Sequence, residues 1–158
     1  MSDTDAIRNL LGRYCELMDA GDYDGVGQLF ADGALADEHG NEFARGAAEV
    51  AASYARTNKA HADTPRTKHL VTNTVIDLDE DGDGATARSS YLVLQATDAL
   101  PLQPIITGRY RDRFARDDVG GWRFAERRFF VDLVGDLREH LTIDLRPRPT
   151  DSPRRSRW

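Results

Sequence analysis

Apolar residues in the first 20 positions recur at the spacing of one helical face. They are separated by steps of three and four residues: Ile7, Leu10, Leu11, Tyr14, Leu17 and Met18. This pattern predicts an amphipathic helix, with Asp3 or Thr4 capping its start and Gly21 closing its end. Tyr14 falls in the middle of the apolar stripe, and Asp19 stands in the last turn. A carboxylate there opposes the helix dipole by about 0.3–1 kcal/mol, so its position requires an explanation.

Two further helices are predicted before residue 60. Asp22 opens a short one, and an Ala-rich run from Ala47 to about Lys59 forms the other. Between them, residues 31–46 are interpreted as a strand, a turn at positions 40–41 and a second short extended piece. A polar loop, AHADTPR, follows the third helix.

The second half of the chain changes to stretches rich in β-branched and aromatic residues. Turn signals separate four of them: TKHLVTNTVIDLD, GATARSSYLVLQAT, PIITGRYRDRFARD and GGWRFAERRFFVDLV. Four long strands with short connections indicate an antiparallel meander. Three helices followed by a meander predict an α+β domain, with the helices on one face of a curved sheet. This domain is expected to span residues 1–142, and the Pro/Arg-rich tail, residues 143–158, is expected to be disordered.

Composition and charge narrow the classes of function. The 158 residues suffice for one domain with a core, and 40% hydrophobic with 30% charged residues is typical of a soluble globular protein. The net charge is 21 − 27 = −6, but the last 13 residues hold five Arg and one Asp, which leaves −10 on the rest. Because nucleic acids favour a basic face, the acidic body argues against a nucleic-acid partner.

The expected location is the cytoplasm, with no membrane partner. No apolar run approaches the roughly 18 residues of a membrane span, and the acidic N-terminus lacks the basic and apolar regions of a secretory signal. Cys15 is the only cysteine, so no internal disulfide can form, which fits a reducing compartment.

Metal and phosphate motifs are not supported. Residues 77–84, DLDEDGDG, resemble a calcium loop, but its twelfth position is Arg88 instead of Glu, so a hairpin turn is the favoured interpretation. The sequence has no Gly-rich phosphate loop, and its four histidines and one cysteine lack zinc spacing. We therefore expect neither a metal site nor a cofactor.

Tyr14, Asp19 and His69 remain as candidates for chemistry. Alternation in the strand that begins near residue 67 places four residues on one face: His69, Val71, Asn73 and Val75. Both faces of this strand are mixed, which predicts that it is covered on both sides. Taken alone, each candidate has a plainer interpretation: a core tyrosine, a surface aspartate and a buried histidine with its bonds satisfied. Tyr14 and Asp19 are about 140° apart around the helix, so they converge only over its end.

Two motifs carry a resemblance to a known family. The first, D-x-G-D-x-D-x-x-x-x-L-F-A-D, runs from Asp19 to Asp32, and the second, H-x-x-x-N, runs from His69 to Asn73. With the order of helices and strands, they resemble the SnoaL-like branch of the nuclear transport factor 2-like superfamily over roughly residues 3–142. The resemblance implies a cone, in which a strongly bent antiparallel sheet wraps around helices and leaves a deep apolar pocket open at one end.

The resemblance also implies a catalytic triplet. Dehydratases of this superfamily act on steroid-like or polyketide substrates with a Tyr and an Asp on the first helix and a His on this strand. Tyr14, Asp19 and His69 match that triplet in type and order. His69 would be the base, Asp19 would orient it, and Tyr14 would donate to a substrate carbonyl.

Asn73, Tyr91 and Arg128 are candidate substrate-binding residues. Alternation in the last strand places Arg128 on one face with Phe124, Glu126 and Phe130. Arg128 can bind an anionic substrate group or pair with Glu126, and the ion pair is favoured. The strand around Tyr91 offers no second carboxylate, which some dehydratases keep there.

Two hypotheses about function follow. The first is a cofactor-independent dehydratase, isomerase or cyclase acting on a hydrophobic, carbonyl-bearing polyketide- or steroid-like substrate, in a homodimer or homo-oligomer formed through the sheet. The second is a non-catalytic ligand-binding or assembly module. The ending VDLVGDLREHL resembles superfamily members that are related to the small subunits of ring-hydroxylating dioxygenases. In the second hypothesis, Tyr14 and His69 are packing residues.

Overall fold

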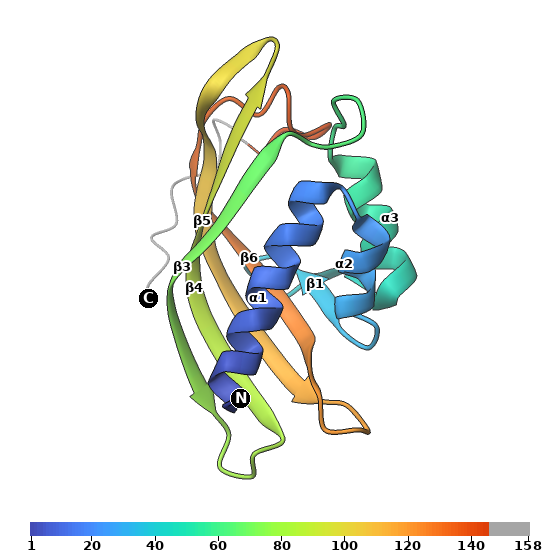
Figure 1. Cartoon of the computed structure of the whole chain (residues 1–158), viewed down its shortest axis with the longest axis vertical. Coiled ribbons are helices and arrows are strands. Elements are labelled where there is room, and N and C mark those ends of the chain that lie inside the picture. The colour runs from blue at the N-terminus through green and yellow to red at the C-terminus, as the bar shows by residue number, and fades with distance from the viewer. Residues whose placement is uncertain (146–158) are drawn as a thin grey trace.

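Three helices lie against one side of a bent sheet in the computed structural model, which describes residues 1–145 (Figure 1). The helices are α1 (Asp3–Ala20), α2 (Tyr23–Leu29) and α3 (Gly46–Thr57). The strands are β1 (Ala34–Ala36), β2 (Glu42–Arg45), β3 (Thr67–Leu78), β4 (Gly84–Thr97), β5 (Leu100–Arg116) and β6 (Trp122–Val134). All predicted elements are present, and β5 begins earlier than the predicted stretch. The expected disorder of the tail lies, from residue 146 onward, outside the described residues.

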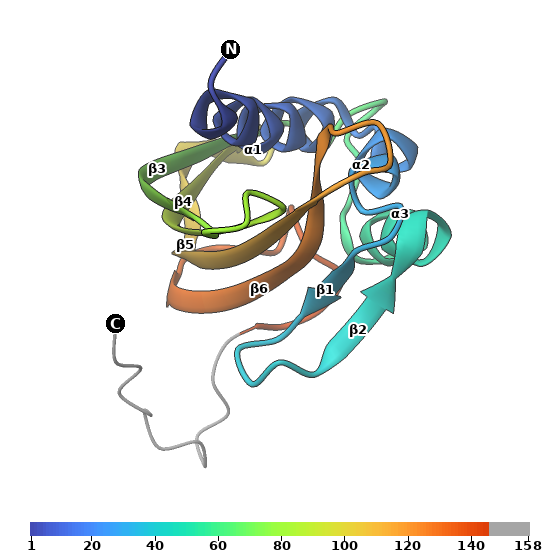
Figure 2. The same cartoon turned by 90° about the horizontal axis from the view of Figure 1, so that it is seen from below.

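The sheet has six strands in the order β2-β1-β6-β5-β4-β3. Strands β3 to β6 form the predicted antiparallel meander, but β1 pairs in parallel with β6, so the sheet is mixed. Figure 2 shows β3 to β6 curving beneath α1, with the β1–β2 hairpin below α3. The predicted α+β class and the cone-like arrangement are confirmed, and the parallel pairing of β1 with β6 makes the sheet mixed where the resemblance implied an antiparallel one.

The N-terminus of α1 is capped one residue earlier than predicted. Ser2 is the N-cap, and its hydroxyl accepts a hydrogen bond from the Asp5 backbone N–H. Asp3 instead accepts hydrogen bonds from Arg116 and from the Trp122 indole, each at 2.9 Å. These contacts attach the first turn of α1 to β5 and β6. Gly21, with φ of 73°, ends the helix as predicted.

Strand β3 contains a bulge that alters which residues face the helices. Asn73 has φ of 53°, and the register with β4 shifts between Thr72 and Val75. One extra residue reverses the alternation beyond it, so Thr74 faces inward, whereas Asn73 and Val75 are exposed. The prediction that Asn73 and Val75 share the face of His69 was therefore wrong. The mixed pattern reflects the bulge, and the outer face is not covered, since Leu70 is 45% exposed.

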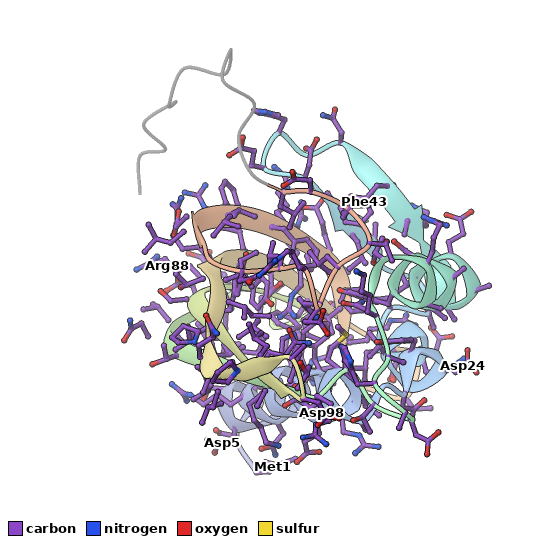
Figure 3. All side chains as sticks on the ribbon, turned by 90° about the horizontal axis from the view of Figure 1, so that it is seen from above. Met1, Asp5, Asp24, Phe43, Arg88 and Asp98 are labelled. Atoms are coloured by element: carbon purple, nitrogen blue, oxygen red, sulfur yellow. The ribbon has the colours of Figure 1, made fainter. Side chains whose placement is uncertain are left out.

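The interior holds two apolar clusters. The larger one joins α1, α2 and α3 to the sheet, and the second is built on β4 and β5 around Tyr91, Ile105 and Tyr110. The C-terminal segment, residues 135–145, packs on the second cluster through Leu137 and Leu141. Figure 3 shows the side chains of the whole chain from above, and those of the two clusters are buried between the sheet and the helices.

Within residues 1–145, no helix combines the length and the apolar character needed to cross a membrane. The stretch that resembled a calcium loop contains the tight turn between β3 and β4, as predicted. No group of three or more His, Cys, Asp or Glu side chains in the described part of the chain is arranged to hold a metal ion.

Candidate functional site

Asp19 and His69 form a short hydrogen bond between α1 and β3. His69 Nδ1 lies 2.6 Å from Asp19 Oδ1. Asp19 stands in the last turn of α1, and His69 is the third residue of β3. The side chains are 10% and 6% exposed, respectively, so the bond is shielded from water. The structure therefore brings together two of the three predicted catalytic residues.

The start of β3 holds the Asp19 carboxylate in place. Both oxygens lie 3.1 Å from the His69 backbone nitrogen, whose N–H donates to them, and the Thr67 hydroxyl donates to Oδ1 at 3.0 Å. Burial alone would raise the pKa of Asp19, but the hydrogen bonds and charge of His69, with the Thr67 bond, lower it below its usual value. Asp19 is therefore an anion at neutral pH. These bonds offset its unfavourable place at the end of the helix.

The bond to Asp19 sets the proton arrangement of the His69 ring. A carboxylate only accepts, so Nδ1 carries the hydrogen, and Nε2 holds the lone pair whenever the ring is neutral. No described residue forms a hydrogen bond with Nε2. His69 also lines a cleft of about 450 Å³ between α1 and β3. The other lining residues come from the same two elements: Arg8, Leu11, Gly12, Cys15, Val71 and Thr74. An imidazole held in this way can accept a proton from a ligand in the cleft.

A second histidine, which the sequence interpretation missed, lies beside this pair. His140 belongs to the C-terminal segment, and its ring centroid is 6.4 Å from that of His69. Its Nδ1 is buried without a hydrogen-bond partner among the described residues. Burial and the nearby charge of His69 lower the pKa of His140 to about 4, so the ring is neutral at pH 7. His140 lies outside any helix or strand, so no periodic pattern indicated its position.

Tyr14 lies in the aromatic core instead of contacting the Asp19–His69 pair. Its hydroxyl is 2.8 Å from that of Tyr54, and neither Asp19 nor His69 is within hydrogen-bond distance. Burial raises the pKa of the Tyr14 phenol, so the group keeps its proton. One of the two hydroxyl groups donates its proton to the other. The hydroxyl proton of the accepting tyrosine has no acceptor among the described residues. The role of Tyr14 as a donor to a carbonyl stays a prediction.

A buried ion pair forms the polar centre of the cone. Arg127 donates to both oxygens of Asp112, at 2.7 and 2.8 Å, and both side chains are fully buried. The guanidinium carbon lies 4.2 Å from the ring centroid of Tyr14 and 3.9 Å from that of Tyr110. Burial would lower the pKa of Arg127, but the charge and hydrogen bonds of Asp112 raise it, so Arg127 stays charged. Its Nη1 atom has no hydrogen-bond partner among the described residues.

Strict alternation along the last strand predicted that Arg128 lies on the face of Phe124, whereas Arg127 is the arginine that does so. The register between β5 and β6 shifts next to Phe124, which leaves Phe124 and Arg127 facing inward. The prediction that Arg128 shares the face of Phe124 was therefore wrong. Arg128 Nε lies 2.6 Å from Glu126 Oε1, so the ion pair that the sequence favoured is confirmed.

The other two predicted substrate-binding residues occupy different environments. Asn73 is exposed on the bulge of β3, with its neighbour Thr74 lining the cleft in its place. Tyr91 lies on the inner face of β4, where its ring stacks on Tyr110 with centroids 4.4 Å apart. Only Tyr91 of the three thus faces the interior of the cone.

The family of the chain follows from comparison with known proteins. The model of the SnoaL-like domain family matches residues 1–128. The chain belongs to the SnoaL-like family. A Mycobacterium tuberculosis protein of unknown function is 32% identical, with 82% of this chain and 72% of that chain covered and a TM-score of 0.67. No curated protein matches the sequence significantly.

Two more distant structures share the fold of this SnoaL-like chain. A protein from Novosphingobium aromaticivorans that is assigned as a scytalone dehydratase is 21% identical, with 85% and 87% of the two chains covered and a TM-score of 0.66. A second protein from the same bacterium, assigned as the β subunit of an aromatic-ring-hydroxylating dioxygenase, is also 21% identical. The match covers 82% of this chain and 89% of that chain, with a TM-score of 0.62. The same fold thus serves proteins assigned to different activities.

Proposed function

We propose that this SnoaL-like protein is a cofactor-independent acid–base enzyme of the dehydratase, isomerase or cyclase type. Its substrate would be a hydrophobic, carbonyl-bearing molecule of polyketide or steroid character. The observation that supports this proposal is the Asp19–His69 pair, because His69 is among the residues that line the cleft between α1 and β3. The assigned scytalone dehydratase among the structural neighbours agrees with this class of reaction.

The chemistry assigned to the pair is proton transfer at the carbon next to the carbonyl. His69 Nε2 takes this proton, which leaves an enolate on the substrate and an imidazolium on His69. Asp19 remains a carboxylate and stabilises the imidazolium through Nδ1. His69 then returns the proton, to a departing hydroxyl in a dehydratase or to another carbon in an isomerase. A positioned base of this kind contributes about 10²- to 10⁴-fold to the rate.

Stabilisation of the enolate oxygen is assigned to the neighbouring polar core. The spare hydroxyl proton of the Tyr14–Tyr54 pair and the unpartnered Nη1 of Arg127 are donors in a dry environment. A substrate carbonyl that reaches either group would bear its developing charge there. Because these groups are buried, this part of the proposal requires the substrate to penetrate between α1 and the sheet.

Substitution of the pair tests the proposal with turnover as the readout. His69→Gln and Asp19→Asn should each abolish elimination of water from apolar β-hydroxy ketones while the circular-dichroism spectrum is retained. His39→Gln is the matched control, because His39 is half exposed in the turn between β1 and β2. A folded His69→Gln variant with wild-type turnover would contradict the assigned role of His69.

The exposed face of the sheet supports self-association, and it also fits the second candidate, a non-catalytic ligand-binding or assembly module. Leu70 on β3, Leu102 on β5 and Leu133 on β6 are 45–71% exposed, and exposed apolar patches mark interaction sites. A homodimer formed through this sheet, in the cytoplasm, is part of the proposal. Light scattering should give a dimeric mass for the wild type and a monomeric mass for Leu70→Lys/Leu133→Lys. If the variant stays dimeric, the sheet is not the interface.

A further inference from the structure

We infer that the cleft between α1 and β3 binds an elongated apolar anion, with its reacting carbon at His69 and its anionic group at Arg8. This inference rests on the proposed function and deepens it, because it names the class of substrate and its orientation. Four features carry the inference: the spacing of the lining residues, the glycine at position 12, the opposite charges of the two ends, and the covered end of the cone.

The lining residues form one continuous wall on each element. Arg8, Leu11, Gly12 and Cys15 follow the one-face spacing of a helix, and His69, Val71 and Thr74 line the cleft from β3. The bulge at Asn73 is what turns Thr74 toward the cleft. Arg8 and Cys15 are seven residues apart, which corresponds to about 10 Å along the helix axis. A volume of about 450 Å³ is in the range of small-molecule sites.

Gly12 leaves the middle of this wall open. It lies in the interior of α1, where glycine disfavours the helix relative to alanine. A Cβ atom built on Gly12 would meet no heavy atom within 4 Å, so no close backbone contact requires the glycine. Its φ is not positive either, so the backbone does not require it. Its local effect is the space that it leaves in the cleft.

The two ends of the cleft differ in charge. Asp19 places a negative charge behind His69 at one end, where the exposed Lys68 Nζ lies 3.8 Å from Asp19 Oδ2 and offsets part of that charge. At the other end Arg8 makes no hydrogen bond or ion pair with any residue in the described range, and its charge acts through space on Asp5. Between them the lining side chains are neutral. A ligand with one anionic group is therefore attracted to the Arg8 end.

The C-terminal segment covers the far end of the cone. Leu137 and His140 are buried there. The Gln95 side-chain amide donates to the backbone carbonyls of Pro65 and Glu139, and the Lys59 N–H donates to the His140 carbonyl. Figure 1 shows this segment crossing near the loop that follows α3. The cleft that His69 lines lies instead between α1 and β3.

Two fluorescent probes of the same shape test the inference without any turnover. 8-Anilino-1-naphthalenesulfonate is the apolar anion, and N-phenyl-1-naphthylamine is its uncharged counterpart. Cys15 reports the location of binding, because it lines the cleft and is the only cysteine. Burial, with the charges of Asp19 and Glu16, raises the pKa of Cys15 to about 11, despite the opposing charge of Arg127, so alkylation by N-ethylmaleimide is measured at pH 9 by mass spectrometry.

We expect the anionic probe to slow Cys15 alkylation and to bind more tightly than the uncharged one. Arg8→Gln should weaken the anionic probe about fivefold, as expected for an exposed ion pair, and leave the uncharged probe unchanged. Gly12→Phe, and the smaller Gly12→Met, should exclude both probes, and Gly12→Ala is the matched control that retains them. Thermal unfolding of each variant verifies that it is folded.

Three results would overturn the inference: fluorescence without protection of Cys15, equal binding by Gly12→Met and Gly12→Ala, or anion affinity that does not respond to Arg8→Gln. Failure of the proposed function gives a different pattern. If both probes bind as expected but His69→Gln does not change turnover, the cleft is a ligand site and His69 is not its base.

Discussion

His69 Nδ1 lies 2.6 Å from Asp19 Oδ1, although the two residues are 50 positions apart in the chain. This bond explains why a carboxylate stands in the last turn of α1. The carboxylate also accepts the backbone N–H of His69 and the hydroxyl of Thr67, so it attaches the end of α1 to the start of β3. One side chain thus has a structural role and orients the imidazole.

Asp19→Asn should lower the free energy of unfolding at pH 7, because an amide replaces a charged acceptor of several hydrogen bonds. The expected loss is about 1–3 kcal/mol. The pKa of Asp19 is lower in the folded state than in the unfolded state, so its stabilisation is present above about pH 4 and is lost as the pH falls through the folded pKa. Urea unfolding at pH 7 and pH 3 should show the difference from wild type shrinking in acid. Asp98→Asn, at an exposed turn, is the control.

His140 should make the protein less stable in mild acid. Its pKa falls from 6.5 to about 4 on folding, so between these values the unfolded chain binds one more proton. Stability is therefore complete above pH 6.5 and declines as the pH falls, by about 2 kcal/mol at pH 5. His140→Leu should remove this part of the decline in urea unfolding experiments, whereas His39→Gln should not. An unchanged pH dependence in His140→Leu would show that folding does not lower the pKa of His140.

The buried pair of Asp112 and Arg127 should show strong coupling. Asp112→Leu alone leaves a buried guanidinium charge and should cost about 3–5 kcal/mol of stability. Arg127→Met alone should have a comparable effect on stability, since it leaves the buried Asp112 carboxylate without its partner. The double variant should lose much less than the sum of the two, as measured in a double-mutant cycle. Additive losses would mean that the two charges do not stabilise each other.

The bulge in β3 should depend on the residue at position 73. Asn73 has φ of 53°, which asparagine and glycine tolerate and β-branched residues do not. Asn73→Gly should be nearly neutral, whereas Asn73→Val should destabilise the protein by about 1–3 kcal/mol. Thermal unfolding compares the two variants. Equal melting temperatures would mean that the left-handed conformation is not retained.

Local patterns predicted the elements and part of the site. The apolar steps of α1 and the four strands of the meander were visible because helices and strands have fixed periods. Asp19 and His69 were candidates because of their motifs and the family resemblance. The parallel pairing of β1 with β6 joins residues about 90 positions apart. The spacing of residues within a single helix or strand contains no information about a pairing of this range.

Bulges account for the misplaced residues. Each one adds a residue to a strand and exchanges the two faces beyond it, so alternation placed Asn73 inward and selected Arg128 instead of Arg127. Asn73 was a usable signal, since asparagine is among the residues that adopt positive φ most readily. His140 carried no such signal, because its position depends on how the C-terminal segment packs on α3 and β4.

Exchange of α-protons in an apolar ketone tests the central claim most directly, because dehydration, isomerisation and cyclisation all begin with the same proton transfer. The rate for 2-tetralone in D₂O is followed by proton NMR with wild type and His69→Gln at equal concentration. We predict catalysis by the wild type and a loss of about 10²- to 10⁴-fold in His69→Gln, with an unchanged melting temperature. Equal exchange by both proteins, or wild-type exchange no faster than in buffer, would contradict the assignment of His69 as the base.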